Sequence, residues 1–248
     1  MATGRERVVH FISRAGLALA LIVSAVVGTA QARERPSIKS VGIISDLGDM
    51  IHVQHIGFMA FSNSLVDVDL SDWQIDNFIT ADLEAALKDH YDLHGVSFDK
   101  GSIRPDLEGL FWTGPSPRKN VRDHASPADG QPIDAYLVVW PFKRDLAYPS
   151  NQHVEGLGLL TGHDALLFAG VALTLVDGRT FDEIGECWLK APMPGHDVTS
   201  YLRRADELKD VESVDAMTAA QKQAFERGMK DFLRDGLNYC LEDLKLAP

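Results

Sequence analysis

The stretch from Ala165 to Leu189 constrains the fold of this chain more than any other. Two apolar runs, ALLFAGVALTLV and EIGECWL, are separated there by the short polar segment DGRTFD. Asp177-Gly178 is a strong turn signal between two such runs. The sequence therefore predicts an antiparallel hairpin with a charged, solvated tip, in which Gly178 adopts a positive φ that suits glycine.

Two further segments read as strands of the same sheet. The run AYLVVWPF, from Ala135 to Phe142, is almost continuously apolar and predicts a central strand buried on both faces that ends at Pro141. Nearer the amino terminus, SVGIIS from Ser40 to Ser45 and MIHVQHIGFMAF from Met50 to Phe61 flank the turn-like DLGD. These two runs predict a second hairpin.

Two amphipathic helices complete the expected fold. Residues 71–74 (SDWQ) fit a capping box, and apolar residues follow at three- and four-residue spacing as far as Tyr91. Residues 218–221 (TAAQ) fit another capping box, and an apolar stripe then runs from Phe225 to Leu244. We expect an α/β (α+β) fold with a single mixed, largely antiparallel sheet, flanking helices and a long carboxyl-terminal helix packed on the sheet.

The amino terminus has the pattern of a secretory signal peptide. Three arginines precede the apolar run Ala15–Gly28, and Ala30-Gln31-Ala32 follows it as an A-x-A cleavage site. The apolar run has 14 residues, fewer than the roughly 20 that span a bilayer, so cleavage is favoured over an uncleaved anchor. We expect a signal peptide at residues 1–32 and a single domain at residues 33–248, with no membrane span after cleavage. The protein would then reside in the periplasm or be secreted.

The charge of the chain limits the classes of partner. Its formal net charge is −12, and phosphate backbones and anionic membrane surfaces repel such a protein. We expect no nucleic acid partner and a protein or envelope component instead. The oligomeric state is left open.

The chain has only two cysteines, Cys187 and Cys240. Cys187 shares a strand face with Gly185 and Leu189, and Cys240 lies in the apolar stripe of the last helix, so the two could meet between sheet and helix. In an oxidising compartment an even pair within reach tends to form a disulfide. The alternative is two free, buried cysteines that pack as small apolar side chains.

Candidate chemistry is sparse. The word Gly-His-Asp occurs twice, at residues 162–164 and 195–197, and a histidine beside an aspartate could form part of a base or metal site. His163, Asp164, His196 and Asp197 are therefore the candidate site residues, with loop turns as the simpler interpretation. His52 and His55 are spaced wrongly for one metal ion on a strand, and Gly156–Gly162 is not a dinucleotide fingerprint and predicts a flexible entry to the next strand. We expect no catalytic residue, no metal site and no cofactor.

The order of these elements, with the words "DAYLVV" and "VALTLVDGRTFDEIGE", resembles the periplasmic α/β fold of the TolB amino-terminal domain. It also resembles the curli secretion channel lipoprotein and the penicillin-binding-protein activator lipoproteins. The words SVGIISDLGD, GFMAFSN and LSDWQID are similar to a group of uncharacterised exported proteobacterial proteins. The resemblance implies a periplasmic assembly, accessory or binding role and transfers no catalytic residue. A non-catalytic, envelope-associated role is thus the leading hypothesis, and a hydrolase or metal-dependent enzyme using the two His-Asp loops is the alternative.

Overall fold

The computed structural model describes residues 37–55, 64–104, 116–146, 152–162, 164–192, 199–209, 211 and 214–247. The chain divides into two units, Met1–Pro36 and Ser37–Pro248, and the fold below is that of the second unit. The predicted signal peptide at residues 1–32 lies outside the described residues.

The sheet is organised around the long strand β10 (Leu166–Asp177). The first part of β10 lies between β9 (Gln152–Thr161) and β14 (Leu202–Arg204), and its second part lies between β7 (Ala135–Pro141) and β11 (Glu183–Trp188). All four neighbours are antiparallel to β10. The predicted hairpin of β10 and β11 is therefore confirmed. The segment Gly156–Gly162, predicted as a flexible entry, lies in β9 as far as Thr161.

The predicted hairpin between residues 40 and 61 is wrong. β1 (Ser40–Ser45) pairs in parallel with β7, and β2 (Met50–His55) pairs in parallel with β9. β7 and β9 both run antiparallel to β10, and β1 and β2 are parallel to them. β1 and β2 therefore run in the same direction, and the chain does not reverse between them. The antiparallel partner of β2 is instead β3 (Ser64–Asp69), and residues 56–63 lie outside the described residues.

Over the described residues, the main sheet has ten strands, of which seven follow the order β3-β2-β9-β10-β7-β1-β4 and three, β8, β11 and β14, lie off this path. Its strands pair mostly antiparallel, and the parallel pairs involve β1 and β2, which confirms the mixed, largely antiparallel sheet. The remaining strands are β4 (Asp92–His94), β8 (Lys143–Leu146), and the small pairs β5 (Val96–Ser97) with β6 (Ser126–Pro127) and β12 (Ala191–Pro192) with β13 (Thr199–Ser200).

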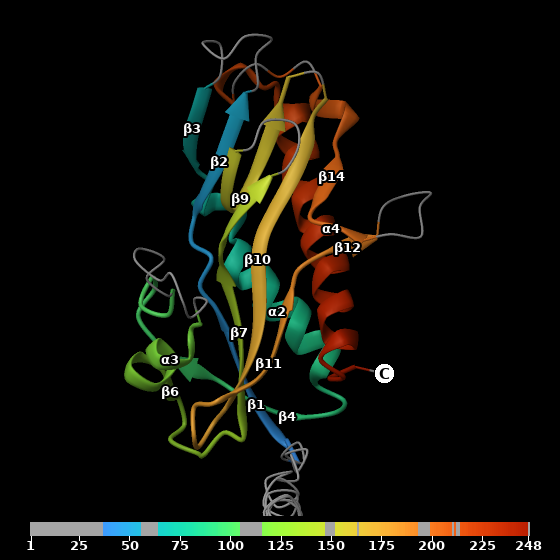
Figure 1. Cartoon of the computed structure of the whole chain (residues 1–248). Helices are drawn as coiled ribbons and strands as arrows, with labels where there is room; N and C mark the ends of the chain where they lie inside the picture. The colour runs from blue at the N-terminus through green and yellow to red at the C-terminus, as the bar shows by residue number, and fades with distance from the viewer. Residues whose placement is uncertain are drawn as a thin grey trace, which may run out of the picture. The chain divides into compact units, whose positions relative to one another are not determined.

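Helices cover both faces of the sheet (Figure 1). α2 (Ile75–Leu87) and α4 (Ala219–Asp243) pack on one face, and the shorter α3 (Arg118–His124) packs on the other. β7 is buried along its whole length, with alternate side chains in each of the two cores. The prediction of a central strand covered on both faces is confirmed. No helix among the described residues has the length and apolar character to cross a membrane.

The two helices predicted from capping boxes begin differently. At α4, the Thr218 side chain accepts a hydrogen bond from the Gln221 amide and the full capping box is present. At α2 the predicted box is wrong, because residues Ser71–Trp73 form a short 3-10 turn and Gln74 precedes the helix with a φ of 51°. This turn buries Trp73, whose ring packs edge-on against the ring of Phe225 with 5.0 Å between their centroids. Two further 3-10 turns among the described residues are Asp206–Leu208 and Val214–Ala216.

A disulfide joins Cys187 of β11 to Cys240 of α4, with 5.4 Å between their α-carbons. Both residues are almost fully buried. The bridge links α4 to β11, the second strand of the hairpin, and its two cysteines are 53 residues apart in the sequence. The long helix predicted to pack on the sheet is therefore also linked to it covalently.

The tip of the β10–β11 hairpin is less solvated than predicted. Asp177 is 8% exposed, and its carboxylate accepts hydrogen bonds from the amides of Arg179 and Thr180. The positive φ belongs to Phe181 and not to Gly178. Gly178 is required for a different reason, since a β-carbon there would lie 1.8 Å from the carbonyl oxygen of Ile133.

Candidate binding cleft

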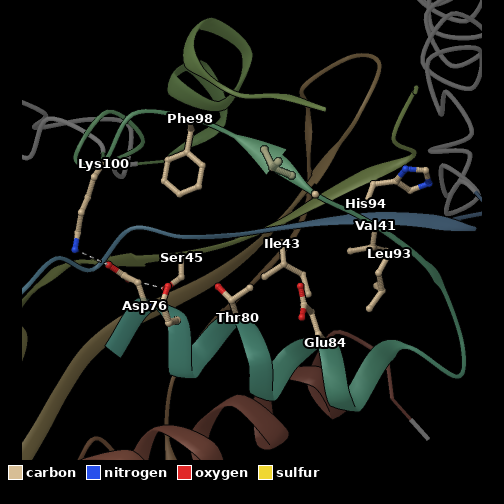
Figure 2. A pocket seen from close by; sticks show the side chains of 13 residues that line it. Val41, Ile43, Ser45, Asp76, Thr80, Glu84, Leu93, His94, Phe98 and Lys100 are labelled. Atoms are coloured by element: carbon tan, nitrogen blue, oxygen red, sulfur yellow. Dashed lines mark hydrogen bonds and ion pairs between the residues drawn. The ribbon is translucent and has the colours of Figure 1, made fainter. Parts of the chain in front are cut away.

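A cleft of about 370 Å³ lies between α2 and the segment that follows β4, beside the outer edge of β1 (Figure 2). Its volume is in the range of small-ligand sites. Apolar and polar side chains both line the cleft: the apolar ones include Val41, Ile43, Leu93, Val96 and Phe98, and the polar ones include Ser45, Asp76, Thr80, Glu84, His94 and Lys100.

The cleft exists because β4 is shorter than β1. Pairing of β1 with β4 ends at Gly42, opposite His94, whereas pairing with β7 continues to Ser45. The chain then leaves the sheet at Gly95 and continues to Lys100. Within the described residues, no strand covers this edge of β1 beyond Gly42.

The direction of the backbone groups on this edge follows from two hydrogen bonds. The Asp46 amide donates to Val139 of β7, and the Asp92 amide of β4 donates to the carbonyl of Lys39. Because backbone groups alternate in direction along a strand, those of Ile43 and Ser45 point away from β7. The pairing of Gly42 with His94 takes up the Ile43 amide, so the Ile43 carbonyl and the Ser45 amide and carbonyl face the cleft. The floor of the cleft is therefore a short, open strand edge.

One wall of the cleft is a polar stripe on α2. Asp76, Thr80 and Glu84 are spaced by four residues and so lie on one side of the helix. Figure 2 shows all three directed from α2 toward β1. The apolar residues Ile75, Ile79, Leu83 and Leu87 are buried in the core, which leaves the polar stripe at the cleft.

Asp76 ties the start of α2 to the end of β1. Its carboxylate accepts hydrogen bonds from the Ser45 hydroxyl at 2.7 Å, the Leu47 amide at 2.9 Å and the Gly48 amide at 3.3 Å. Lys100 closes this end of the cleft, with its Nζ 2.7 Å from Asp49 Oδ1 and 3.7 Å from Asp76 Oδ2. The hydrogen bond to Asp49, followed by the charge of Asp76, raises the pKa of Lys100, which therefore stays protonated.

The acidic loop after β1 is also occupied by structural contacts. Asp46 is fully buried, and its carboxylate accepts hydrogen bonds from the amides of Gly101 and Ile103. The Nε of Arg104 donates to the Asp46 carbonyl at 2.9 Å. Gly48 has a φ of +88°, and any β-carbon there would overlap the Arg104 guanidinium. The loop thus holds the segment 100–104 in place and leaves no free carboxylate for chemistry.

The opposite wall is apolar, with a histidine at its end. Val96 and Phe98 are partly buried and pack on the face away from α2, whereas Leu93 packs against the core on the α2 side. His94 Nδ1 lies 3.0 Å from Asp129 Oδ2, and its Nε2 lies 3.2 Å from Asp92 Oδ2. The hydrogen bond to Asp129 is the largest of the effects that raise the pKa of His94 above its ordinary value of 6.5. This histidine therefore links β4 to the loop before β7.

The arrangement can bind a ligand through three kinds of contact. It offers backbone donors and acceptors on the β1 edge, an apolar wall, and hydroxyl and carboxylate groups on α2. Asp76, Lys100 and His94 already have charged partners, whereas the described residues provide no ion pair to Glu84. Among the described residues, no group of three His, Cys, Asp or Glu side chains is placed to hold a metal ion.

Of the four site residues chosen from the sequence, the structure describes only Asp164, which does not line this cleft. His163, His196 and Asp197 lie outside the described residues. Asp164 is described, and its carboxylate forms a 2.8 Å ion pair with Arg204 of β14. The predicted grouping of the four residues therefore stays a prediction.

The two histidines of β2 have separate partners. His52 Nδ1 lies 2.6 Å from Asp67 Oδ1 of β3, and His55 Nδ1 lies 3.0 Å from the Thr161 hydroxyl of β9. Each histidine thus contacts a different neighbouring strand.

Sequence reasoning missed the cleft residues, although one signal was present. The four-residue spacing of Asp76, Thr80 and Glu84 marks a polar stripe on this helix, whose prediction rests on the spacing of its apolar residues. What the sequence did not indicate is that this stripe faces an uncovered strand edge. No protein-family model and no curated protein matches the chain.

Proposed function

We propose that this is a non-catalytic exported protein that binds a protein or other envelope component, as a binding or assembly accessory, through the cleft beside β1. The observation that carries the proposal is the uncovered edge of β1 at Ile43–Ser45 within a cleft of about 370 Å³. Such an edge offers hydrogen-bonding groups that a partner can complete.

The engagement of the acidic residues near the cleft supports binding over catalysis. Asp46 and Asp76 accept hydrogen bonds from backbone amides, and Lys100 pairs with Asp49. A general base or nucleophile needs a group free to exchange protons or attack a substrate. These groups hold the fold together instead.

The Cys187–Cys240 disulfide supports an exported location. Disulfides persist in oxidising compartments and are rare in the reducing cytosol. The signal-peptide pattern at residues 1–32 agrees with the same location, either the periplasm or the outside of the cell. The resemblance of the layout to periplasmic accessory domains also agrees with a binding role.

Site-specific photo-cross-linking in cells that export the protein tests the proposal. A photoreactive residue at Asn77, which lines the cleft, should give a defined adduct, and the same probe at Lys222, exposed on α4, should not. The Thr80→Trp variant fills the cleft and should abolish the Asn77 adduct. The same adducts from all three proteins, or none from Asn77, would contradict the proposed function.

A further inference from the structure

We propose that the occupant of the cleft is an extended peptide segment with a basic side chain, which adds as a strand to the edge of β1 at Ile43–Ser45. This inference rests on the proposed function and names the class of partner.

The strand edge fixes the conformation of the occupant. Ile43 and Ser45 direct backbone groups into the cleft, because the Asp46 amide is bonded to β7 on the other side. Three residues of strand extend about 10 Å at about 3.3 Å per residue. An extended peptide of similar length can pair with this edge, as in other cases where a segment adds a strand to a sheet.

The two walls fix the pattern of side chains. Successive side chains of an added strand point to opposite faces of the sheet. One face is covered by α2, with Thr80 and Glu84, and the other by the segment carrying Phe98, as Figure 2 shows. Val96 packs against the same core as Phe98. A central polar side chain toward α2, flanked by apolar side chains toward Phe98, fits both walls.

The charge of the cleft selects a basic side chain. Lys100 is already paired with Asp49 at 2.7 Å and lies 3.7 Å from Asp76. Glu84 has no such partner among the described residues, and it lines the cleft two helical turns further along α2. A Lys or Arg on the peptide would therefore meet an available carboxylate, in a chain whose net charge is −12.

A second copy of this chain fits the cleft less well. The exposed edge strand β3 carries Leu65 and Val66 at 62% and 52% exposure, and it could in principle serve as the added strand. However, β3 also carries Asp67 and Asp69, which would bring further negative charge toward Glu84. The basic peptide is accordingly the favoured occupant.

The test uses blocked peptides and amide resonances of the mature protein. The parent probes are acetyl-Ala-Xaa-Lys-Xaa-Ala-amide, with Xaa as Val, Ile or Phe in separate titrations to about 1 mM. We expect at least one probe to shift the amide resonances of Ile43, Ser45 and Gly95. Replacing its lysine with glutamate should weaken binding about tenfold or more, because the acidic peptide repels Glu84.

N-methylation separates strand addition from simple filling of the cleft. Only alternate amides of an added strand face β1, so methylating the lysine amide and methylating the adjacent Xaa amide should differ. One isomer should lose about tenfold or more in affinity while the other binds almost as the parent does. Equal binding by both isomers would overturn strand addition.

Two protein variants complete the test. Glu84→Lys should weaken binding of the lysine peptide and strengthen binding of the glutamate peptide, whereas Glu242→Lys, exposed near the end of α4, should change neither. The absence of any shift at Ile43 and Ser45 with all probes would overturn the inference. If no peptide shifts these resonances but the Asn77 adduct still forms in cells, the proposed function stands and only the peptide assignment fails. If no adduct forms either, both fail. Self-association on sedimentation, lost in Glu84→Lys, would identify a second copy as the occupant instead.

Discussion

The hydroxyl of Ser45, the last residue of β1, donates a 2.7 Å hydrogen bond to the carboxylate of Asp76 in the first turn of α2. The same carboxylate accepts hydrogen bonds from the Leu47 and Gly48 amides. Both residues come after Gly42, the last residue of β1 that pairs with β4. Asp76 thus replaces the missing strand at the end of β1 and leaves the edge just before it, at Ile43–Ser45, uncovered. The open edge and the helix wall of the cleft have the same structural origin.

Removing the Asp76 carboxylate should destabilise the fold. Asp76→Ala leaves the Leu47 and Gly48 amides without their acceptor, and such a loss costs about 2 kcal/mol of unfolding free energy. Asp76→Asn keeps one acceptor oxygen and should cost less. Urea denaturation measures both, with Asp72→Ala, at an exposed position, as the control that should change stability by under about 0.5 kcal/mol. A neutral Asp76→Ala would show that the carboxylate does not hold the loop.

The disulfide should be present in the exported protein and should stabilise it. Thiol titration of the unfolded, unreduced mature protein should find no free thiol, since Cys187 and Cys240 are joined. Closing a loop with a sequence separation of 53 residues contributes about 4 kcal/mol in the chain-entropy model. The Cys187→Ala, Cys240→Ala double variant should lose up to that amount, and its stability should be insensitive to reductant. Two titratable thiols in the natural protein would refute the bridge.

The hairpin tip should tolerate side-chain loss but not a methyl group at its glycine. Gly178→Ala places a β-carbon 1.8 Å from the Ile133 carbonyl oxygen and should cost about 2 kcal/mol or more. Arg179→Ala and Asp182→Ala, at exposed positions, should each cost under about 0.5 kcal/mol. Thermal or urea unfolding of the three variants measures this difference, and a tolerated Gly178→Ala would mean that the tip does not pack against Ile133.

The contribution of His94 to stability should depend on pH. Its pKa is raised above 6.5 in the folded protein, first by the hydrogen bond to Asp129, so its stabilising effect is fully present below that value. The effect is lost as the pH rises through the raised pKa. The unfolding free energy lost in His94→Gln should therefore be larger at about pH 5.5 than at about pH 8.5. His124→Gln, outside this contact, is the control, and a loss in His94→Gln that grew with pH would contradict the bridge to Asp129.

The elements that the sequence predicted correctly are those specified by local patterns. The β10–β11 hairpin has a two-residue turn signal at Asp177-Gly178, and α4 has both a capping box at Thr218 and a long apolar stripe. In each case neighbouring residues determine the element. The sheet is largely antiparallel because β10, the first strand of this hairpin, pairs antiparallel with all four of its neighbours.

The relationship of β1 to β2 could not be read in the same way. The DLGD segment between them contains Gly48 at a φ of +88°, a turn feature that is compatible with either reversal or continuation of the chain. The choice depends on β7 and β9, which pair with β1 and β2 from about 100 residues later in the chain. The residue pattern of β1 and β2 alone does not indicate which later strands they pair with.

The cleft was missed for a related reason. It is formed where β4 ends before β1, and the lengths of two paired strands are set by tertiary contacts and not by their own residue patterns. The His-Asp words drew attention because of their residue types. Asp164, the one member among the described residues, pairs with Arg204, and the two His-Asp loops stay a prediction from residue type alone.

Amide hydrogen exchange at three successive residues tests the account most directly. In the free protein, Ile44 and Asp46 direct their amides toward β7, where Asp46 is bonded to Val139, whereas the Ser45 amide between them faces the cleft. We predict that Ser45 exchanges about 100-fold or more faster than both neighbours in the same strand. Equal protection of Ser45, Ile44 and Asp46 would show that the edge of β1 is already covered and would contradict the account.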